Sequence, residues 1–176
     1  MKSRRHILQL PLALAVPPLM AAAPAARAQS AVVAPAHTLT SVSSRGDRVS
    51  LQALRGSVVL VFAWSANCPV CLDKLPELRR NLDGWQGKPF VILALNHDRS
   101  ADDMRNYERI FEQAAPMRSQ FKHLWRGASE HRDSFGELPK NAPTTLIFDK
   151  QGALAKNVRG RIPVELWDDI AELVLG

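Results

Sequence analysis

The sequence predicts one α/β domain: a mixed β-sheet with helices on both faces, preceded by an N-terminal β-hairpin. Three observations lead to this fold class. The chain has 176 residues, which is enough for one domain with its own hydrophobic core. Runs of apolar and β-branched residues, typical of buried strands, alternate with segments in which apolar residues recur at helical spacing. The last two predicted strands are joined by a short turn and therefore form a hairpin.

Residues 1–28 are predicted to be an export signal that does not belong to the domain. A basic start containing Arg4 and Arg5 precedes a long apolar stretch, which ends in alternating small residues at Ala28. Prolines interrupt this stretch, whereas a spanning helix needs roughly 20 apolar residues, so an uncleaved membrane anchor is the less favoured alternative. The start also resembles a twin-arginine signal. We expect cleavage near Ala28, a domain over 29–176 and a periplasmic location.

The net charge narrows the classes of partner. It is formally +6 for the whole chain, but four basic and no acidic residues lie in the predicted signal, so 6 − 4 = +2 remains for the domain. A nearly balanced charge without a basic stripe gives no electrostatic footprint for nucleic acid. We therefore predict that the protein binds no nucleic acid.

The first half of the domain predicts a hairpin, a buried strand and a helix, in that order. Residues 37–50 alternate apolar and polar side chains around a turn that contains glycine, which is typical of a β-hairpin. After a short connecting turn, residues 58–64 are continuously apolar, as in a strand buried on both faces. Apolar residues from 69 to about 81 then keep helical spacing, and Pro76 is expected to kink this helix.

The middle of the domain is only partly readable. Residues 90–95 predict a second buried strand, and Ser100 resembles the cap of a helix. The residues expected on the buried face of that helix are Met104, Tyr107, Ile110 and Phe111. Residues 115–140 carry no clear pattern, although Phe121, Leu124 and Trp125 are expected to pack inward.

The end of the domain predicts a hairpin and a helix. Residues 144–148 and 153–158 have strand character, and the polar turn 149–152 joins them. Pro163 is expected to open the last helix. Its buried face is predicted to contain Leu166, Trp167, Ile170 and Leu173.

The chain has two cysteines, Cys68 and Cys71, at the start of the first predicted helix. A disulfide between them would close a four-residue loop and stabilise the fold by only about 2 kcal/mol, against about 3 kcal/mol for a fifteen-residue loop. We therefore interpret the pair as a redox site. Because a helix N-terminus favours an anion, we expect Cys68 to be the exposed, attacking thiolate and Cys71 to resolve the mixed disulfide.

Several segments resemble the thioredoxin superfamily, and more closely its exported TlpA/ResA-like branch. The matching segments are Leu51-Gln52-Ala53-Leu54-Arg55-Gly56, residues 58–71 with Cys68-Pro69-Val70-Cys71, Pro76, Ala142-Pro143-Thr144-Thr145 and residues 149–152. The resemblance implies a thioredoxin-like fold and a thiol-disulfide oxidoreductase that uses no cofactor. The partners that it implies are protein thiols or disulfides and a membrane redox protein.

The resemblance also implies how a substrate is held. In the family, the proline of the x-Pro-Thr-Thr segment follows a cis peptide bond and lies against the cysteines. Pro143 and Ala142 are therefore expected to bind an extended substrate by strand addition. Trp64, four residues before Cys68, is expected to border the site.

Three positions depart from the family pattern. Asn67 stands where a Trp is usual before the first cysteine, Phe62 stands where an acid or Asn is common, and Lys74 stands where a Glu is frequent. Because fewer anionic neighbours favour the thiolate, we predict a reduction potential less negative than the roughly −270 mV of thioredoxin.

Four other functions are weighed against this interpretation. A zinc site needs about four ligands, and the chain has only two cysteines and no spaced pair of histidines to complete one. Covalent haem attachment needs a histidine where Leu72 stands. A peroxiredoxin-like site agrees with Ser65 but requires a proline where Val61 stands. Copper binding or copper-site assembly through two cysteines and a distant histidine stays open as the alternative. His97 follows a buried strand and is interpreted as a loop residue without a catalytic role.

Overall fold

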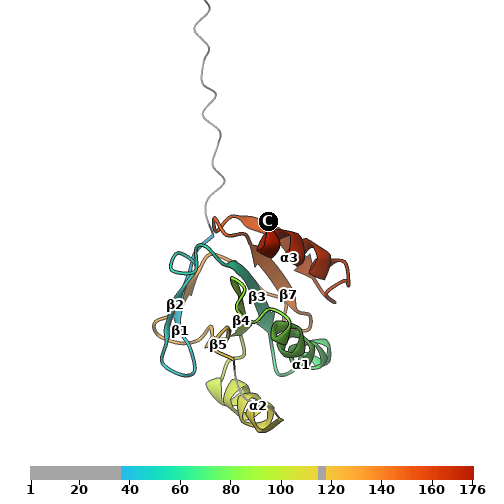
Figure 1. The fold of residues 1–176 in the computed structure, drawn as a ribbon. Helices are drawn as coiled ribbons and strands as arrows, with labels where there is room; N and C mark the ends of the chain where they lie inside the picture. Colours follow the sequence, from blue (N-terminus) through green and yellow to red (C-terminus); the bar gives the residue numbers. More distant parts are fainter. Residues whose placement is uncertain (1–36, 115–117) are drawn as a thin grey trace, which may run out of the picture. The chain divides into compact units, whose positions relative to one another are not determined.

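The structure is a computed structural model that describes residues 37–114 and 118–176. The predicted export signal and its cleavage position lie outside these residues. The described elements are β1 (Leu39–Val42), β2 (Arg48–Ser50), β3 (Val58–Trp64), α1 (Pro69–Asp83), β4 (Phe90–Asn96), α2 (Ala101–Ala114), β5 (Phe121–Trp125), β6 (Arg132–Asp133), β7 (Thr144–Phe148), β8 (Leu154–Arg159) and α3 (Leu166–Leu175). Figure 1 shows their arrangement.

The main sheet has five strands in the order β5-β4-β3-β7-β8. Strands β3, β4 and β5 are parallel to one another, whereas β7 runs antiparallel to both of its neighbours, β3 and β8. Every residue of the central strand β3 is buried, as its continuous apolar sequence predicts. The predicted mixed sheet is therefore confirmed.

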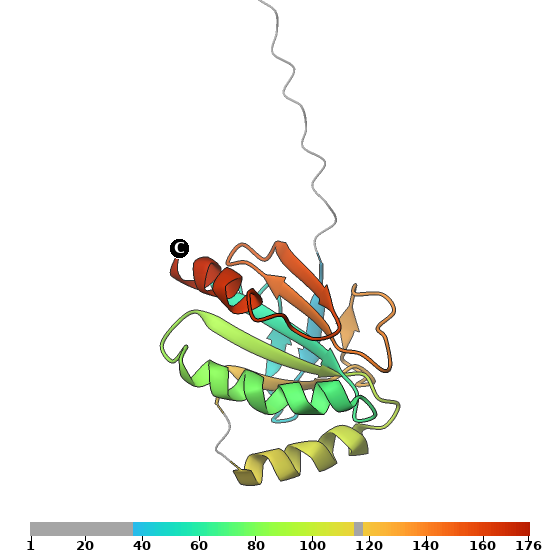
Figure 2. The same cartoon turned by 90° about the vertical axis from the view of Figure 1, so that its right-hand side faces the viewer.

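The two faces of the main sheet pack into separate hydrophobic cores. Helices α1, α2 and α3 all contribute to the core on one face. The other core is closed by the small sheet β2-β1-β6 and the segments beside it, including Leu51 and Leu138. Figures 1 and 2 show α1 and α3 on one side of the main sheet and the β1–β2 hairpin on the other. The N-terminal hairpin is thus confirmed. It covers the second face of the main sheet, where the alternation of strands and helices in the sequence predicts a helix.

Several elements differ from their predicted extent. Strands β5 and β6 form within the segment that carried no clear pattern. The pattern of β5 is hard to recognise because Lys122 and His123 interrupt its apolar run. The prediction for Ile110 is wrong, since 66% of its surface is exposed, whereas Met104 and Phe111 are buried. The last helix begins at Leu166, three residues after Pro163, and buries Leu166 and Ile170 as predicted.

No described helix is both long enough and apolar enough to cross a membrane.

Candidate active site at the N-terminus of α1

The two cysteines meet where β3 ends and α1 begins. Cys68 is the N-cap of α1, with an extended backbone, and Pro69 occupies the first turn, as predicted. The structure contains a disulfide between Cys68 and Cys71, whose Cα atoms are 5.2 Å apart. The backbone amide of Cys71 donates a hydrogen bond to the Cys68 sulfur at 3.2 Å. The same amide also donates to the Cys68 carbonyl at 2.9 Å, so it is shared between the carbonyl and the sulfur of the N-cap residue.

In this disulfide form Cys68 is buried, whereas the exposed thiolate predicted for Cys68 belongs to the reduced protein. Both Cys68 and Cys71 are 0% exposed and belong to the core that contains α1. The neighbours Asn67 and Pro69 are exposed, so the sulfur lies below a surface formed by the residues that flank it. Cys68 is buried because it is the N-cap of α1 and its disulfide with Cys71 turns its side chain back onto the first turn of the helix.

A carboxylate at the end of β4 supports the loop that leads to Cys68. The Ser65 hydroxyl donates to Asp98 Oδ1 at 2.6 Å, and the Ala66 amide donates to Oδ2 at 2.7 Å. The side-chain amide of Asn96 also donates to Oδ2, at 2.7 Å. Burial acts to raise the pKa of Asp98, but these three donors outweigh it and the pKa is lowered. Asp98 therefore carries its negative charge at neutral pH.

Sequence reasoning did not identify Asp98. The available signal was its place just after a buried strand, together with Asn96, since polar residues at the carboxyl ends of parallel strands gather at one edge of the sheet. The neighbouring His97 is half-buried, and burial lowers its pKa. Its backbone amide donates to the Trp64 carbonyl at 3.1 Å, which joins the ends of β3 and β4.

The strand register brings Pro143 to the same end of the sheet as the cysteines. Ala63 pairs with Thr144, so Pro143 lies beside the last residue of β3, from which the chain continues to Cys68. The expected cis bond before Pro143 is wrong, because the described residues contain no cis peptide bond; trans is the ordinary preference of such bonds, by about 0.5–1 kcal/mol. The Pro143 carbonyl accepts from the Gly160 amide at 2.8 Å, so the residue that follows β8 already uses this acceptor. Ala142 is half-buried beside it.

Trp64 is buried in the core that also contains both cysteines. It is 0% exposed, and its ring packs against Tyr107 with a centroid separation of 5.0 Å. Trp64 and the two cysteines belong to the same hydrophobic core. The structure thus gives Trp64 a packing role within the core that contains the disulfide.

The three departures from the family pattern occupy different environments. Phe62 is fully buried in β3, and Asn67 is exposed. Lys74 forms a 2.7 Å ion pair with Glu77 on the same helix. This pair offsets the charge through which Lys74 was expected to favour the thiolate, so Lys74 has less influence on the cysteines than the sequence alone suggests.

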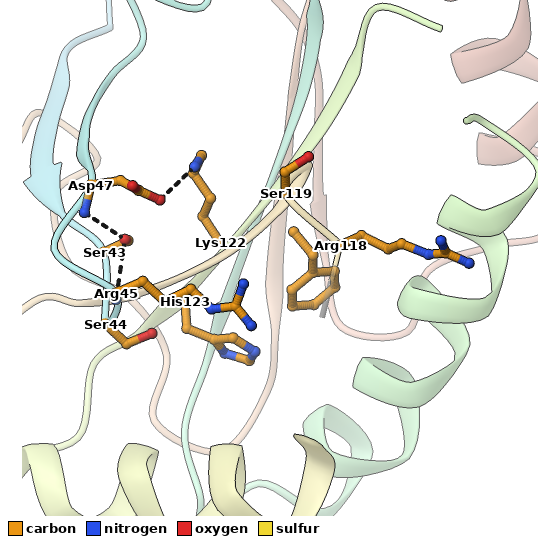
Figure 3. Close-up of a pocket in the computed structure, with 9 residues that line it drawn as sticks. Ser43, Ser44, Arg45, Asp47, Arg118, Ser119, Lys122 and His123 are labelled. Atoms are coloured by element: carbon orange, nitrogen blue, oxygen red, sulfur yellow. Dashed lines mark hydrogen bonds and ion pairs between the residues drawn. The ribbon is translucent and has the colours of Figure 1, made fainter. Parts of the chain in front are cut away.

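A second polar cluster lies away from the cysteines, where the β1–β2 turn meets β5 (Figure 3). Its three cations are already paired with carboxylates, in the pairs Arg45–Glu112, Lys122–Asp47 and Arg118–Asp83, at 2.9 to 3.3 Å. His123 is fully buried beside it, and burial is the main cause that lowers its pKa to about 3. His123 is therefore neutral at physiological pH, and the cluster offers no unpaired charge for chemistry.

Within residues 37–114 and 118–176, no group of three or more His, Cys, Asp or Glu side chains could hold a metal ion. Ser65, which resembles a peroxiredoxin position, has its hydroxyl engaged by Asp98.

Comparisons with known proteins agree with the sequence interpretation. The AhpC/TSA family matches residues 31–157. A comparison with curated protein sequences gave no match.

Among solved structures, a thiol:disulfide interchange protein of the thioredoxin family from Chlorobium tepidum has 18% identity and a TM-score of 0.61, covering 81% of this chain and 96% of its own. The thioredoxin domain of a thiol-disulfide oxidoreductase from Bacteroides vulgatus has 20% identity and a TM-score of 0.59, covering 78% and 93%. An exposed lipoprotein thioredoxin from Streptococcus pneumoniae has 19% identity and a TM-score of 0.56, covering 77% and 99%. These likenesses show a shared thioredoxin-like fold.

Proposed function

The chain belongs to the AhpC/TSA family, and from this premise we propose that it is a periplasmic thiol-disulfide oxidoreductase that exchanges disulfides with protein partners through Cys68-Pro69-Val70-Cys71. The observation that carries the proposal is the Cys68–Cys71 disulfide at the N-terminus of α1, with the Cys68 sulfur accepting from the Cys71 amide. The same amide would stabilise a Cys68 thiolate after reduction.

The reaction moves two electrons from the protein to its partner. In the reduced protein, the Cys68 thiolate attacks one sulfur of the partner's disulfide, and the other partner sulfur leaves as a thiolate that takes up a proton. Cys71 then loses its proton and attacks the Cys68 sulfur. The second partner sulfur leaves and is protonated, and the Cys68–Cys71 disulfide forms again. The partner ends as a dithiol, and the protein requires an external dithiol reductant, for which we propose a membrane redox protein.

We also propose that Pro143 and Ala142 form part of the surface that receives the partner. The register of β3 and β7 supports this role, because it places Pro143 beside the strand that leads to Cys68. Since the residue that follows β8 already occupies the Pro143 carbonyl, backbone pairing with a substrate at this position would use the side of the Ala142 peptide that faces away from β8.

Single cysteine substitutions test the chemistry. Cys68→Ser should abolish the reduction of a protein disulfide, because the attacking thiolate is lost. Cys71→Ser should instead accumulate a covalent complex between Cys68 and its partner, which is visible on a non-reducing gel and disappears with excess dithiol. If alkylation of the reduced protein near neutral pH modified Cys71 faster than Cys68, the assignment of roles would be wrong.

The trapped complex also identifies the partner, which is the part of the function that the fold leaves open. Metal analysis of the reduced protein, compared with the double Cys68→Ser and Cys71→Ser variant, distinguishes the copper-binding alternative. Copper retained only when both thiols are present would favour that alternative over disulfide exchange. Consumption of peroxide by the reduced protein, measured separately, would indicate peroxidase chemistry.

A further inference from the structure

The loop before Cys68 has a fixed turn of its own. The Asn67 amide donates to the Ser65 hydroxyl oxygen at 3.1 Å, and the Cys68 amide donates to the Ser65 carbonyl, also at 3.1 Å. Ser65 thus organises the peptide that ends at Cys68. Because the Ser65 hydroxyl donates its own proton to Asp98, the position of the turn depends on that carboxylate.

Asp98 is itself held by the neighbouring strands. Its backbone amide donates to Asn96 Oδ1 at 3.1 Å, and its carbonyl accepts from the Trp125 indole at 3.0 Å. Asn96 is fully buried and pairs in the sheet with Trp64 of β3 and Trp125 of β5. The carboxylate that supports the loop is therefore anchored to the carboxyl ends of three parallel strands.

The chemistry of the contacts favours a carboxylate as the acceptor. All three groups that face the carboxylate are donors, and an ionised carboxylate is the side chain that only accepts. Charge-assisted hydrogen bonds of this kind are about twice as strong as neutral ones. The other titratable or charged side chains that act on this corner are His97 and Arg126, and His97 is the group whose charge is coupled to Asp98.

We propose that Asp98 is the positioning residue of the site, whose carboxylate holds residues 65–67 so that the Cys68 sulfur stays at the N-terminal amides of α1. This inference rests on the proposed function and adds the group that aligns its nucleophile. Without Asp98, the Ser65 hydroxyl and the Ala66 amide lose their acceptor, and the loop loses its link to β4. The Cys68 sulfur would then spend less time in contact with the Cys71 amide, and its thiolate would be less favoured.

The test measures the rate of Cys68 alkylation against pH in the reduced protein, in a Cys71→Ser background. Asp98→Ala and Asp98→Asn both remove the negative charge beside the loop before Cys68, which by itself favours the thiolate, so the comparison between the two variants isolates positioning. Asp98→Asn keeps an oxygen that can accept from Ala66 and Asn96. Asp98→Ala keeps no acceptor, so its profile should lie at higher pH and its alkylation at neutral pH should be about tenfold slower than that of Asp98→Asn. Asp103→Ala, which removes an exposed carboxylate from the first turn of α2, is the matched control and should leave the profile unchanged.

A profile in Asp98→Ala that matches that of Asp98→Asn, even with a lower melting temperature, would overturn the proposal and leave Asp98 a purely structural anchor. Ser65→Ala removes one link with a smaller change in packing and should slow alkylation by a smaller factor than Asp98→Ala. It carries the test if Asp98→Ala does not fold. Alkylation needs a thiol but no partner, so a parent protein that alkylates normally and fails to reduce protein disulfides would refute the proposed function without deciding the role of Asp98.

Discussion

Two buried histidines in this protein have opposite hydrogen-bonding environments. His131 binds the Ser41 hydroxyl at 3.0 Å through Nδ1 and the Asp133 carboxylate at 2.7 Å through Nε2. Neither ring nitrogen of His123 has a hydrogen-bond partner among the described residues, and Glu108 is 4.0 Å from Nδ1. His123 instead packs against the ring of Phe121, with centroids 5.0 Å apart. An unpaired buried polar group costs about 1–3 kcal/mol, so the two rings should contribute to stability with opposite signs.

His123→Phe should raise the free energy of unfolding by about 1 kcal/mol or more at neutral pH, because it removes this unpaired group from an aromatic environment. The gain should increase as the pH falls below about 6.5. Burial lowers the pKa of His123 to about 3, so the unfolded chain binds a proton near pH 6.5 that the folded chain does not accept until about pH 3. The parent protein loses stability over that window, and the variant avoids this loss. Urea unfolding at neutral and mildly acidic pH measures both effects.

The control is His131→Phe, a change of the same size at a histidine whose two nitrogens are bound. It should lower the free energy of unfolding by about 1–3 kcal/mol, because Ser41 and Asp133 lose their partner in a buried position. Equal destabilisation by both substitutions would show that His123 has a partner in solution, such as a buried water.

Helix α1 determines the electrostatics of the cysteines through its first turn. That turn contains no acidic residue, and Pro69 and Val70 separate the cysteines. Lys74 is neutralised in part by Glu77, so the helix N-terminus and the apolar Phe62 are left as the main influences on the thiolate. The first turn of α1 thus adds no negative charge beside the thiolate, and we therefore keep the prediction of a reduction potential less negative than about −270 mV.

Val70→Asp should make the reduction potential more negative by about 6–20 mV. A charge at a helix terminus contributes about 0.3–1 kcal/mol, and 30 mV corresponds to about 1.4 kcal/mol for two electrons. The negative charge disfavours the Cys68 thiolate and hence the reduced form. Equilibration with glutathione buffers measures the potential. Val164→Asp, at a position that is 77% exposed before α3, is the control and should leave the potential unchanged; a shift toward less negative values in Val70→Asp would contradict the electrostatic argument.

The elements that the sequence predicts well are the buried strands and the helix with a regular apolar face. Strands β3 and β4 and helix α1 are continuous in their apolar residues or regular in their spacing. Strand β5 was missed because its alternation places the polar His123 toward the core, where local sequence carries no sign of burial. Cys68 and Cys71 were predicted from their spacing, whereas Asp98 and the burial of both sulfurs depend on contacts between segments far apart in the chain.

At the scale of the whole molecule, the two cores are joined by the central sheet. Neighbouring residues of β3 belong to different cores: Leu60 packs with α1 and α3, and Val61 packs with the residues beneath the β1–β2 hairpin. The disulfide lies in the first core. The second core contains no cysteine among the described residues, so its side chains affect the site through the strands rather than by contact.

The protein should be exported through the twin-arginine route. Replacing Arg4 and Arg5 by Lys should stop export, because this signal requires the arginine pair, whereas a general secretory signal would tolerate the same charge. Cell fractionation measures the distribution, with Lys2→Arg as the charge-preserving control. Unchanged export of the Lys-Lys variant would leave an ordinary signal peptide. N-terminal sequencing of the exported protein should give Gln29 as its first residue.

The covered disulfide is expected to react differently with small thiols and with protein partners. A small thiol that reaches the oxidised protein meets the exposed Asn67 and Pro69, while both sulfurs are 0% exposed. Its rate of attack then scales with the fraction of time for which the first turn of α1 opens. A protein partner that binds the surrounding surface stabilises the opened state with its own binding energy. Under the proposed function, a protein partner is therefore expected to reduce the disulfide faster than a small thiol at equal concentration, because it promotes the opening that a small thiol depends on.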